Sequence, residues 1–288
     1  MVQDNVVVGI VYLSVALFCL PLHLVIIFIF TSNAEFRKLA SYQIMTHIGV
    51  VDCLQLLVHV YSGILGGLAN AGWIAMIMMV LVLALNRLEV VGEIRIISCA
   101  TSTKMYTMLT FLSWMIGVAF FCCYLTPHTG MKYNHRNFYW SLEGEENITE
   151  ALSDAETYST IPALAIALLI YAVICLIIIS KKKALISTKK ILSNQEIRIL
   201  LQALIICGCI VLEICCWHWG DHFLPNSFYT PIVINTMWIL ENGALNPTLY
   251  LIMNKSIRRK FVDIVSFSKN YQLFVSANSV PTPISQNR

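Results

Sequence analysis

Seven long apolar runs constrain this chain more than any other feature of its sequence. The runs lie at residues 6–30, 41–63, 72–91, 105–126, 158–180, 197–219 and 229–253. A helix needs about 20 mainly apolar residues to cross a bilayer, and the first run contains no Asp, Glu, Lys or Arg. Only 12% of the chain is charged, whereas soluble domains average about 25%. We therefore expect an all-α bundle of seven transmembrane helices.

The positions of lysine and arginine predict the orientation of this bundle. Basic residues concentrate in the cytoplasmic loops of membrane proteins. If the N-terminus lies outside, every one of the 19 Lys and Arg residues falls inside except Lys132 and Arg136. We therefore expect the N-terminus outside and the C-terminus in the cytoplasm.

The connection at residues 127–157 is consistent with an outside position. It is acidic, and it contains Asn147-Ile-Thr149, the acceptor pattern for N-glycosylation. Residues 1–263 are expected to form the transmembrane domain. Residues 264–288 are rich in Ser, Asn, Pro and Gln, a composition that predicts a disordered cytoplasmic tail.

Polar residues inside the apolar runs are candidates for function, because a charge in the bilayer is costly. Asp52 lies about 16 Å into the second run at 1.5 Å per residue, near the bilayer centre. Asn246 and Pro247 lie toward the cytoplasmic end of the seventh run, where the proline permits a kink. Asn246 is then placed to contact Asp52 through water. The alternative is a neutral Asp52 that only holds helices together.

Arg87 and Glu241 each leave two interpretations open. Arg87 follows Asn86 about one turn from the cytoplasmic end of the third run. It either snorkels to the interface or bonds neighbouring helix ends and rearranges when the bundle opens. Glu241 in the seventh run suits a ligand cavity and a structural hydrogen bond equally well.

Two further polar positions lie in the sixth run. Glu213 is another intramembrane acid. Trp217-His218-Trp219 marks the outer end of the run, where an aromatic belt at the membrane interface is the simplest interpretation.

No pattern points to an enzyme or a cofactor. The ten cysteines lack metal-ligand spacing, and none lies in a segment placed outside, so no extracellular disulfide is expected. His-Glu-x-x-His, Gly-x-Ser-x-Gly and phosphate-binding glycine loops are absent from the sequence. Residues 229–253 contain no lysine for a retinal Schiff base, which excludes an opsin.

Together these features resemble a rhodopsin-like G-protein-coupled receptor. The most specific stretch is Asn246-Pro-Thr-Leu-Tyr250, at the end of the seventh run. Within that superfamily the chain is similar to the nematode serpentine chemoreceptors of the Srt class, with the Srx class as the alternative. The matching stretches are residues 41–52, 83–87, 202–207 and 251–258.

The resemblance implies a receptor for a small chemical cue that activates a heterotrimeric G protein. Such a receptor contacts lipid, binds no nucleic acid and lies in the plasma membrane of sensory-neuron cilia. The residues that would serve activation and coupling are Asn86, Arg87, Asn246, Pro247 and Tyr250. A short amphipathic helix would follow the seventh span on the cytoplasmic face, with Ile257 and Phe261 dipping into lipid.

The chain departs from the superfamily pattern in several places. Asn86-Arg87-Leu88 replaces an acidic-Arg-aromatic triplet, no proline follows Trp217, and no cysteine lies at the outer end of the third run. Only 35 positions separate Asp52 from Arg87, and glycines indicate a loop at residues 65–71. This spacing predicts that the outer part of the third span is missing. A shortened, non-functional receptor product and a seven-span transporter therefore stay as alternatives.

Overall fold

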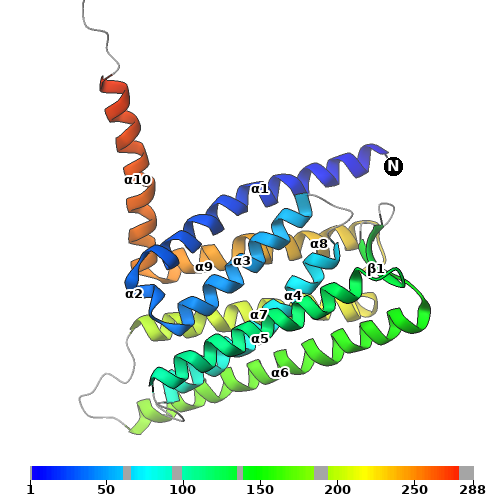
Figure 1. The fold of residues 1–288 in the computed structure, drawn as a ribbon, viewed down its shortest axis with the longest axis horizontal. Coiled ribbons are helices and arrows are strands. Elements are labelled where there is room, and N and C mark those ends of the chain that lie inside the picture. Colours follow the sequence, from blue (N-terminus) through cyan, green and yellow to red (C-terminus); the bar gives the residue numbers. More distant parts are fainter. Residues whose placement is uncertain (1, 61–65, 93–98, 135–138, 185–193, 279–288) are drawn as a thin grey trace, which may run out of the picture.

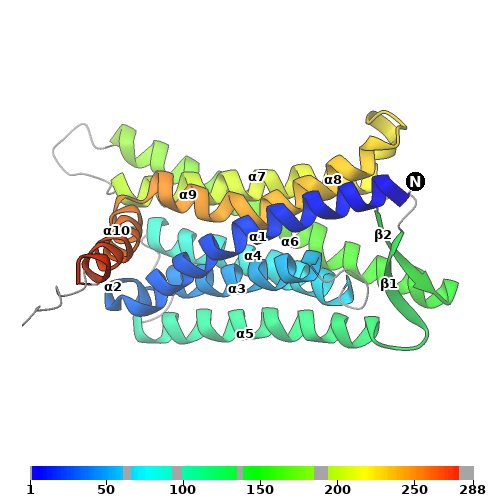
Figure 2. The same cartoon turned by 90° about the horizontal axis from the view of Figure 1, so that it is seen from above.

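The computed structural model describes residues 2–60, 66–92, 99–134, 139–184 and 194–278, and within these ranges each of the seven apolar runs is mainly helical. The first six runs lie in α1 (Val2–Ser32), α3 (Ala40–Val60), α4 (Gly66–Gly92), α5 (Cys99–Tyr124), α6 (Glu146–Ala184) and α7 (Asn194–Phe223). The seventh run is one rod made of α8 (Tyr229–Leu240), the π-helical segment η1 (Glu241–Leu245) and α9 (Asn246–Met253). These helices lie side by side (Figures 1 and 2), so the expected seven-helix bundle is confirmed.

The outward faces of the bundle are apolar, as contact with lipid requires. Five helices, α1, α4, α5, α6 and α7, are each long and apolar enough to cross a membrane. Large apolar side chains lie exposed along them, such as Phe18 of α1, Met108 of α5 and Leu169 of α6. Water would penalise this surface by about 25 cal/mol per Å², whereas lipid accepts it. The chain is therefore a multi-pass membrane protein.

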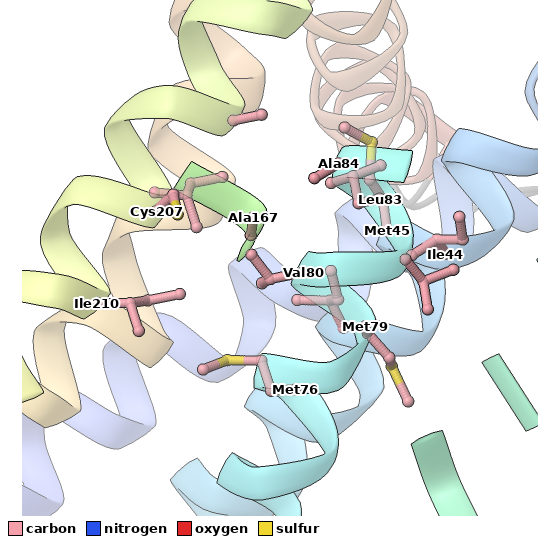
Figure 3. Packing of buried hydrophobic residues seen from close by; sticks show 14 of the residues in the cluster. Ile44, Met45, Met76, Met79, Val80, Leu83, Ala84, Ala167, Cys207 and Ile210 are labelled. Carbon is pink, nitrogen blue, oxygen red and sulfur yellow. The ribbon is translucent and has the colours of Figure 1, made fainter. Parts of the chain in front are cut away.

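Helix α4 runs through the centre of the bundle and packs against α3, α5 and α6. Its residues Met79 and Leu83 are buried in one cluster with Ile44 of α3, Ala167 of α6 and Ile210 of α7 (Figure 3). The flexible methionine side chains fill gaps of irregular shape between these helices. The position of α4 therefore determines how its neighbours pack.

The third span is complete, which corrects the expectation that its outer part is missing. Helix α4 begins at Gly66 instead of residue 72 and has 27 residues. At 1.5 Å per residue it is about 40 Å long, which exceeds the hydrocarbon thickness of about 30 Å. The glycines that indicated a loop lie in its first turns, because Trp140 packs there against Gly66: a Cβ on Gly66 would lie 2.2 Å from the Trp140 ring.

A two-stranded antiparallel hairpin covers one end of the bundle, a feature that the sequence patterns did not predict. Strand β1 (Thr129–Asn134) pairs with β2 (Tyr139–Gly144). Lys132 Nζ lies 2.8 Å from Glu143 Oε2 across the hairpin. The hydrogen bond and the charge of Lys132 hold the pKa of the Glu143 carboxyl below its usual range.

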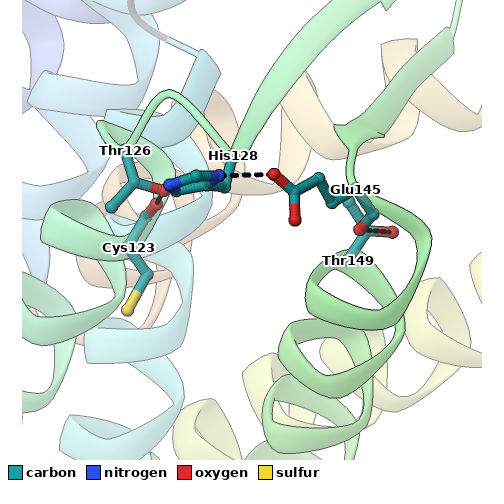
Figure 4. A network of polar contacts seen from close by, with 5 residues as sticks. All are labelled: Cys123, Thr126, His128, Glu145 and Thr149. Atoms are coloured by element: carbon teal, nitrogen blue, oxygen red, sulfur yellow. Dashed lines mark hydrogen bonds and ion pairs between the residues drawn. The ribbon is translucent and has the colours of Figure 1, made fainter.

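The base of the hairpin connects directly to α6. His128 Nδ1 lies 2.5 Å from Glu145 Oε1, so the residue before β1 contacts the residue after β2 (Figure 4). Helix α6 then begins at Glu146, well before the expected residue 158. Asn147, the predicted glycosylation site, is exposed in its first turn.

At the opposite end of the bundle, α10 (Lys255–Asn278) points away from the helix axes (Figure 1). Asn254 caps this helix, because its Oδ1 accepts hydrogen bonds from the amides of Ser256 and Ile257 at 3.1 and 3.2 Å. Its Nδ2 also donates to Tyr42 of α3 at 2.8 Å. The turn between α9 and α10 is therefore fixed to the bundle.

Helix α10 corrects two expectations about the C-terminal region. It continues to Asn278, so residues 264–278 are helical instead of disordered. The segment from 255 to 278 contains no Gly or Pro to interrupt it, while residues 279–288 lie outside the described part. Ile257 is buried in the bundle core and Phe261 packs against it, instead of both dipping into lipid.

Lys260 attaches α10 to the short helix α2 (Ala34–Arg37). Its ammonium donates a hydrogen bond to Asn33 Oδ1 and lies 5.6 Å from the centre of the Phe36 ring. This cation–π contact and the hydrogen bond hold α10 against the first two helices.

Close packing of α4 against α5 predicts opposite effects for two Gly→Ala substitutions. A Cβ on Gly117 of α5 would lie 2.8 Å from the Ala71 carbonyl oxygen and 2.9 Å from the Ala75 Cβ. We expect Gly117→Ala to lower the free energy of unfolding by about 1–3 kcal/mol through overpacking. Nothing lies within 4 Å of such a Cβ on Gly208, so Gly208→Ala is expected to stabilise by about 0.5–1 kcal/mol.

Thermal unfolding of the two purified variants in detergent measures this difference. A melting temperature for Gly117→Ala equal to that of Gly208→Ala would contradict the close approach of α4 and α5.

Candidate functional site

A cavity of about 200 Å³ lies beneath the hairpin. Residues from α4, β1, β2, α6, α7 and α8 form its walls: Asn70, Trp73, Met131, Trp140, Leu142, Ser153, Glu156, Thr157, Glu213, Ile214, Trp217, His218 and Trp238. A pocket enclosed by several elements, mostly apolar and holding a few polar groups, is the usual form of a small-molecule site.

Four tryptophans dominate the walls of this cavity. Trp73 comes from α4, Trp140 from β2, Trp217 from α7 and Trp238 from α8. The rings of Trp217 and Trp238 meet edge to face with their centres 6.2 Å apart. Trp217 therefore lines the cavity, a position that the expected aromatic belt did not indicate.

One carboxylate of the cavity is held by a network of neutral donors. Asn70 Nδ2 donates to Glu156 Oε2 at 2.9 Å, and the Tyr124 hydroxyl donates to the same oxygen at 3.1 Å. Asn70 also donates to the Tyr124 oxygen at 2.7 Å. These contacts join α4, α5 and α6 and fix the direction of the Glu156 side chain.

The second carboxyl of the cavity belongs to Glu213, which is only 5% exposed. It lies within hydrogen-bonding reach of Glu241 in η1. Glu241 itself does not line the cavity, so it lies behind Glu213. Glu241 therefore makes a hydrogen bond to a neighbouring acid that faces the cavity and does not line the cavity itself.

A wider cavity of about 770 Å³ lies beside the first one, between α7 and the start of α8. The two cavities share Trp140 and Trp217 in their walls. These two rings therefore form part of the wall between the first cavity and the wider one.

A second polar centre lies deeper in the bundle, around Asp52. The Asp52 side chain is fully buried, and Asn246 Nδ2 donates directly to its Oδ2 at 2.8 Å. His23 of α1 lies 3.9 Å from the same oxygen. The structure thus brings Asp52 and Asn246 together without the water that we had expected between them.

The π-helical segment η1 follows from Pro247. Proline has no amide hydrogen to donate to the carbonyl of Gly243, four residues earlier. The helix widens there, and His23 lies against the backbone of Asn242 and Gly243. π-helical segments at such positions are frequent at functional sites.

The third polar group lies toward the end of the bundle that carries α10. Arg87 of α4 is only 5% exposed, and its neighbour Asn86 is equally buried. Arg87 interacts electrostatically with the hydroxyls of Tyr171 and Tyr250. It therefore does not snorkel to the interface in this arrangement of the helices.

These groups form a line through the bundle. Glu213 contacts Glu241, and Glu241 interacts electrostatically with Asp52. Tyr250 lies near both Asp52 and Arg87. Buried polar groups thus lie between the cavity and Arg87. Among the described residues, no group of three His, Cys, Asp or Glu side chains is placed to hold a metal ion.

Comparison with known families decides the identity of this bundle. The family model for the serpentine type 7TM GPCR chemoreceptor Srt matches residues 60–273, which is most of the chain. The chain belongs to the Srt family. The resemblance noted in the sequence is thereby confirmed, and the family is one of receptors.

The crystal structure of squid rhodopsin has the same fold as this Srt chain. The two are 12% identical and superpose with a TM-score of 0.70 over 92% of this chain and 86% of the squid chain. At that identity the likeness concerns the fold alone. No curated protein sequence matches the chain.

The sequence identified the polar residues deep in the bundle better than the residues that line the cavity. Asp52, Arg87 and Asn246 stood out because polar residues in apolar runs are costly, and Tyr250 stood out through the resemblance. Glu156 carried no such signal, because it lies in a segment that appeared to be a polar loop. The tryptophans come from four separate elements, so no local spacing marked them as a group.

The Asp52–Asn246 hydrogen bond predicts a measurable loss when its donor is removed. Asn246→Leu keeps a similar volume but leaves the buried Asp52 oxygen unpaired, so we expect a loss of about 1–3 kcal/mol in unfolding free energy. Asn226→Leu, at an exposed position, is the matched control.

An exchange of the two side chains tests the same bond. Asp52→Asn combined with Asn246→Asp keeps one donor facing one acceptor and is expected to recover most of the lost stability. Thermal unfolding in detergent measures all three variants. Equal stability of Asn246→Leu and Asn226→Leu would contradict the predicted importance of the bond.

Proposed function

We propose that this Srt-family protein is a chemosensory receptor that binds a small molecule and activates a heterotrimeric G protein. The ligand binds in the cavity of about 200 Å³ beneath the hairpin, which we call the outer cavity. The observation that carries the proposal is the line of buried polar groups between the cavity and Arg87. A ligand that changes the outer end of this line changes the electrostatic surroundings of its inner end. No enzymatic step and no cofactor belong to this function.

The distribution of charge supports an orientation with the N-terminus outside. The start of α1 and the hairpin lie at one end of the bundle, and α2 and α10 lie at the other (Figure 1). Lys132 is at the hairpin end, whereas Lys255, Arg258 and Lys260 belong to the α10 end. Basic residues favour the cytoplasmic side, so the cavity opens outward and the Arg87 end faces the G protein.

The burial of Arg87 supports a closed bundle that must open to act. A partner helix reaches Arg87 only if the surrounding helix ends separate. Phe30 and Tyr250 now pack edge to face with ring centres 5.3 Å apart, and both are buried. Ligand binding would favour a second arrangement in which these ends part, which is a shift between two populations.

Three further residues lie where this change would take place: Asn86, Asn246 and Pro247. Asn246 and Pro247 lie at the junction of η1 and α9, where a helix already wider than an α-helix rotates most easily. Asn86 precedes Arg87 on α4. Asp52 holds this junction in the closed arrangement through its bond to Asn246.

The resemblance to nematode chemoreceptors suggests the plasma membrane of sensory-neuron cilia as the place of action. A glycan on Asn147 would lie at the outer end of α6. A seven-span transporter is the rival function, and it predicts substrate flux without a G protein. A non-functional product is less favoured now, because α4 spans its full length.

Surface labelling tests the orientation. We expect a tag before α1 to be accessible to antibody on intact cells and a tag after residue 288 to be accessible only after permeabilisation. A glycosidase should shift the wild-type protein but not Asn147→Gln. An accessible C-terminal tag on intact cells would overturn the proposed orientation.

Substitution at the inner end tests the coupling. We expect Arg87→Ala and Tyr250→Phe to weaken activation of a G protein by the ligand about 5- to 150-fold at equal surface expression, the usual range of allosteric coupling. Lys132→Ala, at the opposite end, serves as the control and should leave coupling unchanged. Undiminished signalling by both inner variants would overturn the proposed mechanism, and substrate flux without a G-protein response would favour the transporter.

A further inference from the structure

The charge balance of the outer cavity indicates what kind of ligand it takes. Two carboxyls, of Glu156 and Glu213, belong to its walls, and no Lys or Arg does among the described residues that line it. The donors that hold Glu156, Asn70 and Tyr124, are neutral. They orient the carboxylate without compensating its charge. A charge in a low-dielectric site stays costly until an opposite charge pairs with it.

The aromatic walls favour the same kind of ligand. Trp73, Trp140, Trp217 and Trp238 come from four elements and share one small cavity. The face of an indole ring attracts a cation within about 6 Å more strongly than the other aromatic side chains do. Carboxylates and indole faces therefore act on a ligand cation in the same direction.

The remaining walls and the volume limit the size of the ligand. Met131, Leu142 and Ile214 add apolar surface between the polar groups. A cavity of about 200 Å³ is smaller than the pockets of about 300–1,000 Å³ that hold drug-sized ligands. A peptide exceeds this space, whereas an amine attached to a small apolar body fits it.

We propose that the outer cavity binds a small organic cation, an amine with an apolar body. Its ammonium pairs with the Glu156 and Glu213 carboxyls and its body packs against the tryptophan rings. An anion would face the Glu156 carboxylate without a cationic partner, and a neutral ligand would leave that charge uncompensated. This inference rests on the proposed receptor function, because it names the ligand class for the same cavity.

Three probes with one aromatic body and different charge test the proposal. They are 2-phenylethylammonium, 2-phenylethanol and 3-phenylpropionate, each added to the purified full-length protein in detergent. A ligand that binds only the folded state raises the melting temperature in a saturable way. We expect saturable stabilisation by the ammonium, binding of the alcohol at least about tenfold weaker, or 1.4 kcal/mol, and no binding of the carboxylate.

Isosteric variants test which side chains recognise the positive charge of the ligand. Glu156→Gln and Glu213→Gln are expected to weaken ammonium binding on the order of 10- to 100-fold and to leave alcohol binding unchanged. Trp73→Phe keeps a ring and should weaken the ammonium by a smaller factor. Glu150→Gln, at an exposed position on α6, is the matched control and should behave as the wild type. Cooperative melting of each variant without ligand verifies that it is folded.

The outcomes separate the ligand class from the receptor function. Equal binding of alcohol and ammonium, tighter binding of the carboxylate, or no binding of the ammonium to a cooperatively melting protein would each overturn the ligand class. Ammonium binding without any G-protein response in cells that display the receptor would support the ligand class and overturn the receptor function. A G-protein response to neutral compounds alone would support the receptor function and overturn the ligand class.

Discussion

A bilayer offers no water to a buried polar group, and the arrangement of helices around Asp52 follows from that constraint. Asp52 is fully buried and takes a hydrogen bond from Asn246 across the bundle. This bond joins α3 to α9, and His23 brings α1 to the same place. Since each of these groups lacks solvent as a partner, separating the helices exposes them to hydrocarbon. The polar centre therefore specifies which helices are neighbours, which apolar packing alone does not.

Helix α4 connects this polar centre to the rest of the bundle. It packs against α3, α5 and α6, and its two ends carry different polar residues. Asn70 and Trp73 lie at its hairpin end, facing the cavity, and Arg87 lies nearer its other end. Because one rigid helix carries all of these residues, a displacement of its hairpin end also moves Arg87. The same helix thus serves as core and as a connection between two sites.

The hairpin is held over the cavity without a covalent link. The described cysteines are all free. Instead, the Trp140 ring packs on Gly66 at the start of α4 and meets the Tyr133 ring at a tilt of 58° with ring centres 5.2 Å apart. Such an anchor depends on the absence of a side chain at Gly66. It also makes Trp140 part of the cavity wall, so the residue that fixes the hairpin is one that the proposed ligand would contact.

The sequence by itself determined the seven spans, because a bilayer imposes a length and a composition on each segment separately. The same local rule marked Asp52, Arg87 and Asn246, since a polar group in an apolar run is conspicuous without knowledge of its partners. The orientation stays a prediction that the charge distribution supports.

Only the tertiary structure decided the rest. The start of α4 at Gly66, the hairpin, the π-helical segment and the helical course of residues 264–278 differ from what local composition indicated or left open. The cavity that joins four tryptophans to Glu156 and Glu213 belongs to this group as well. Each of these features depends on contacts between residues far apart in the chain. A glycine is helical when a tryptophan from another element fills the space beside it, and no rule of spacing along the sequence contains that information.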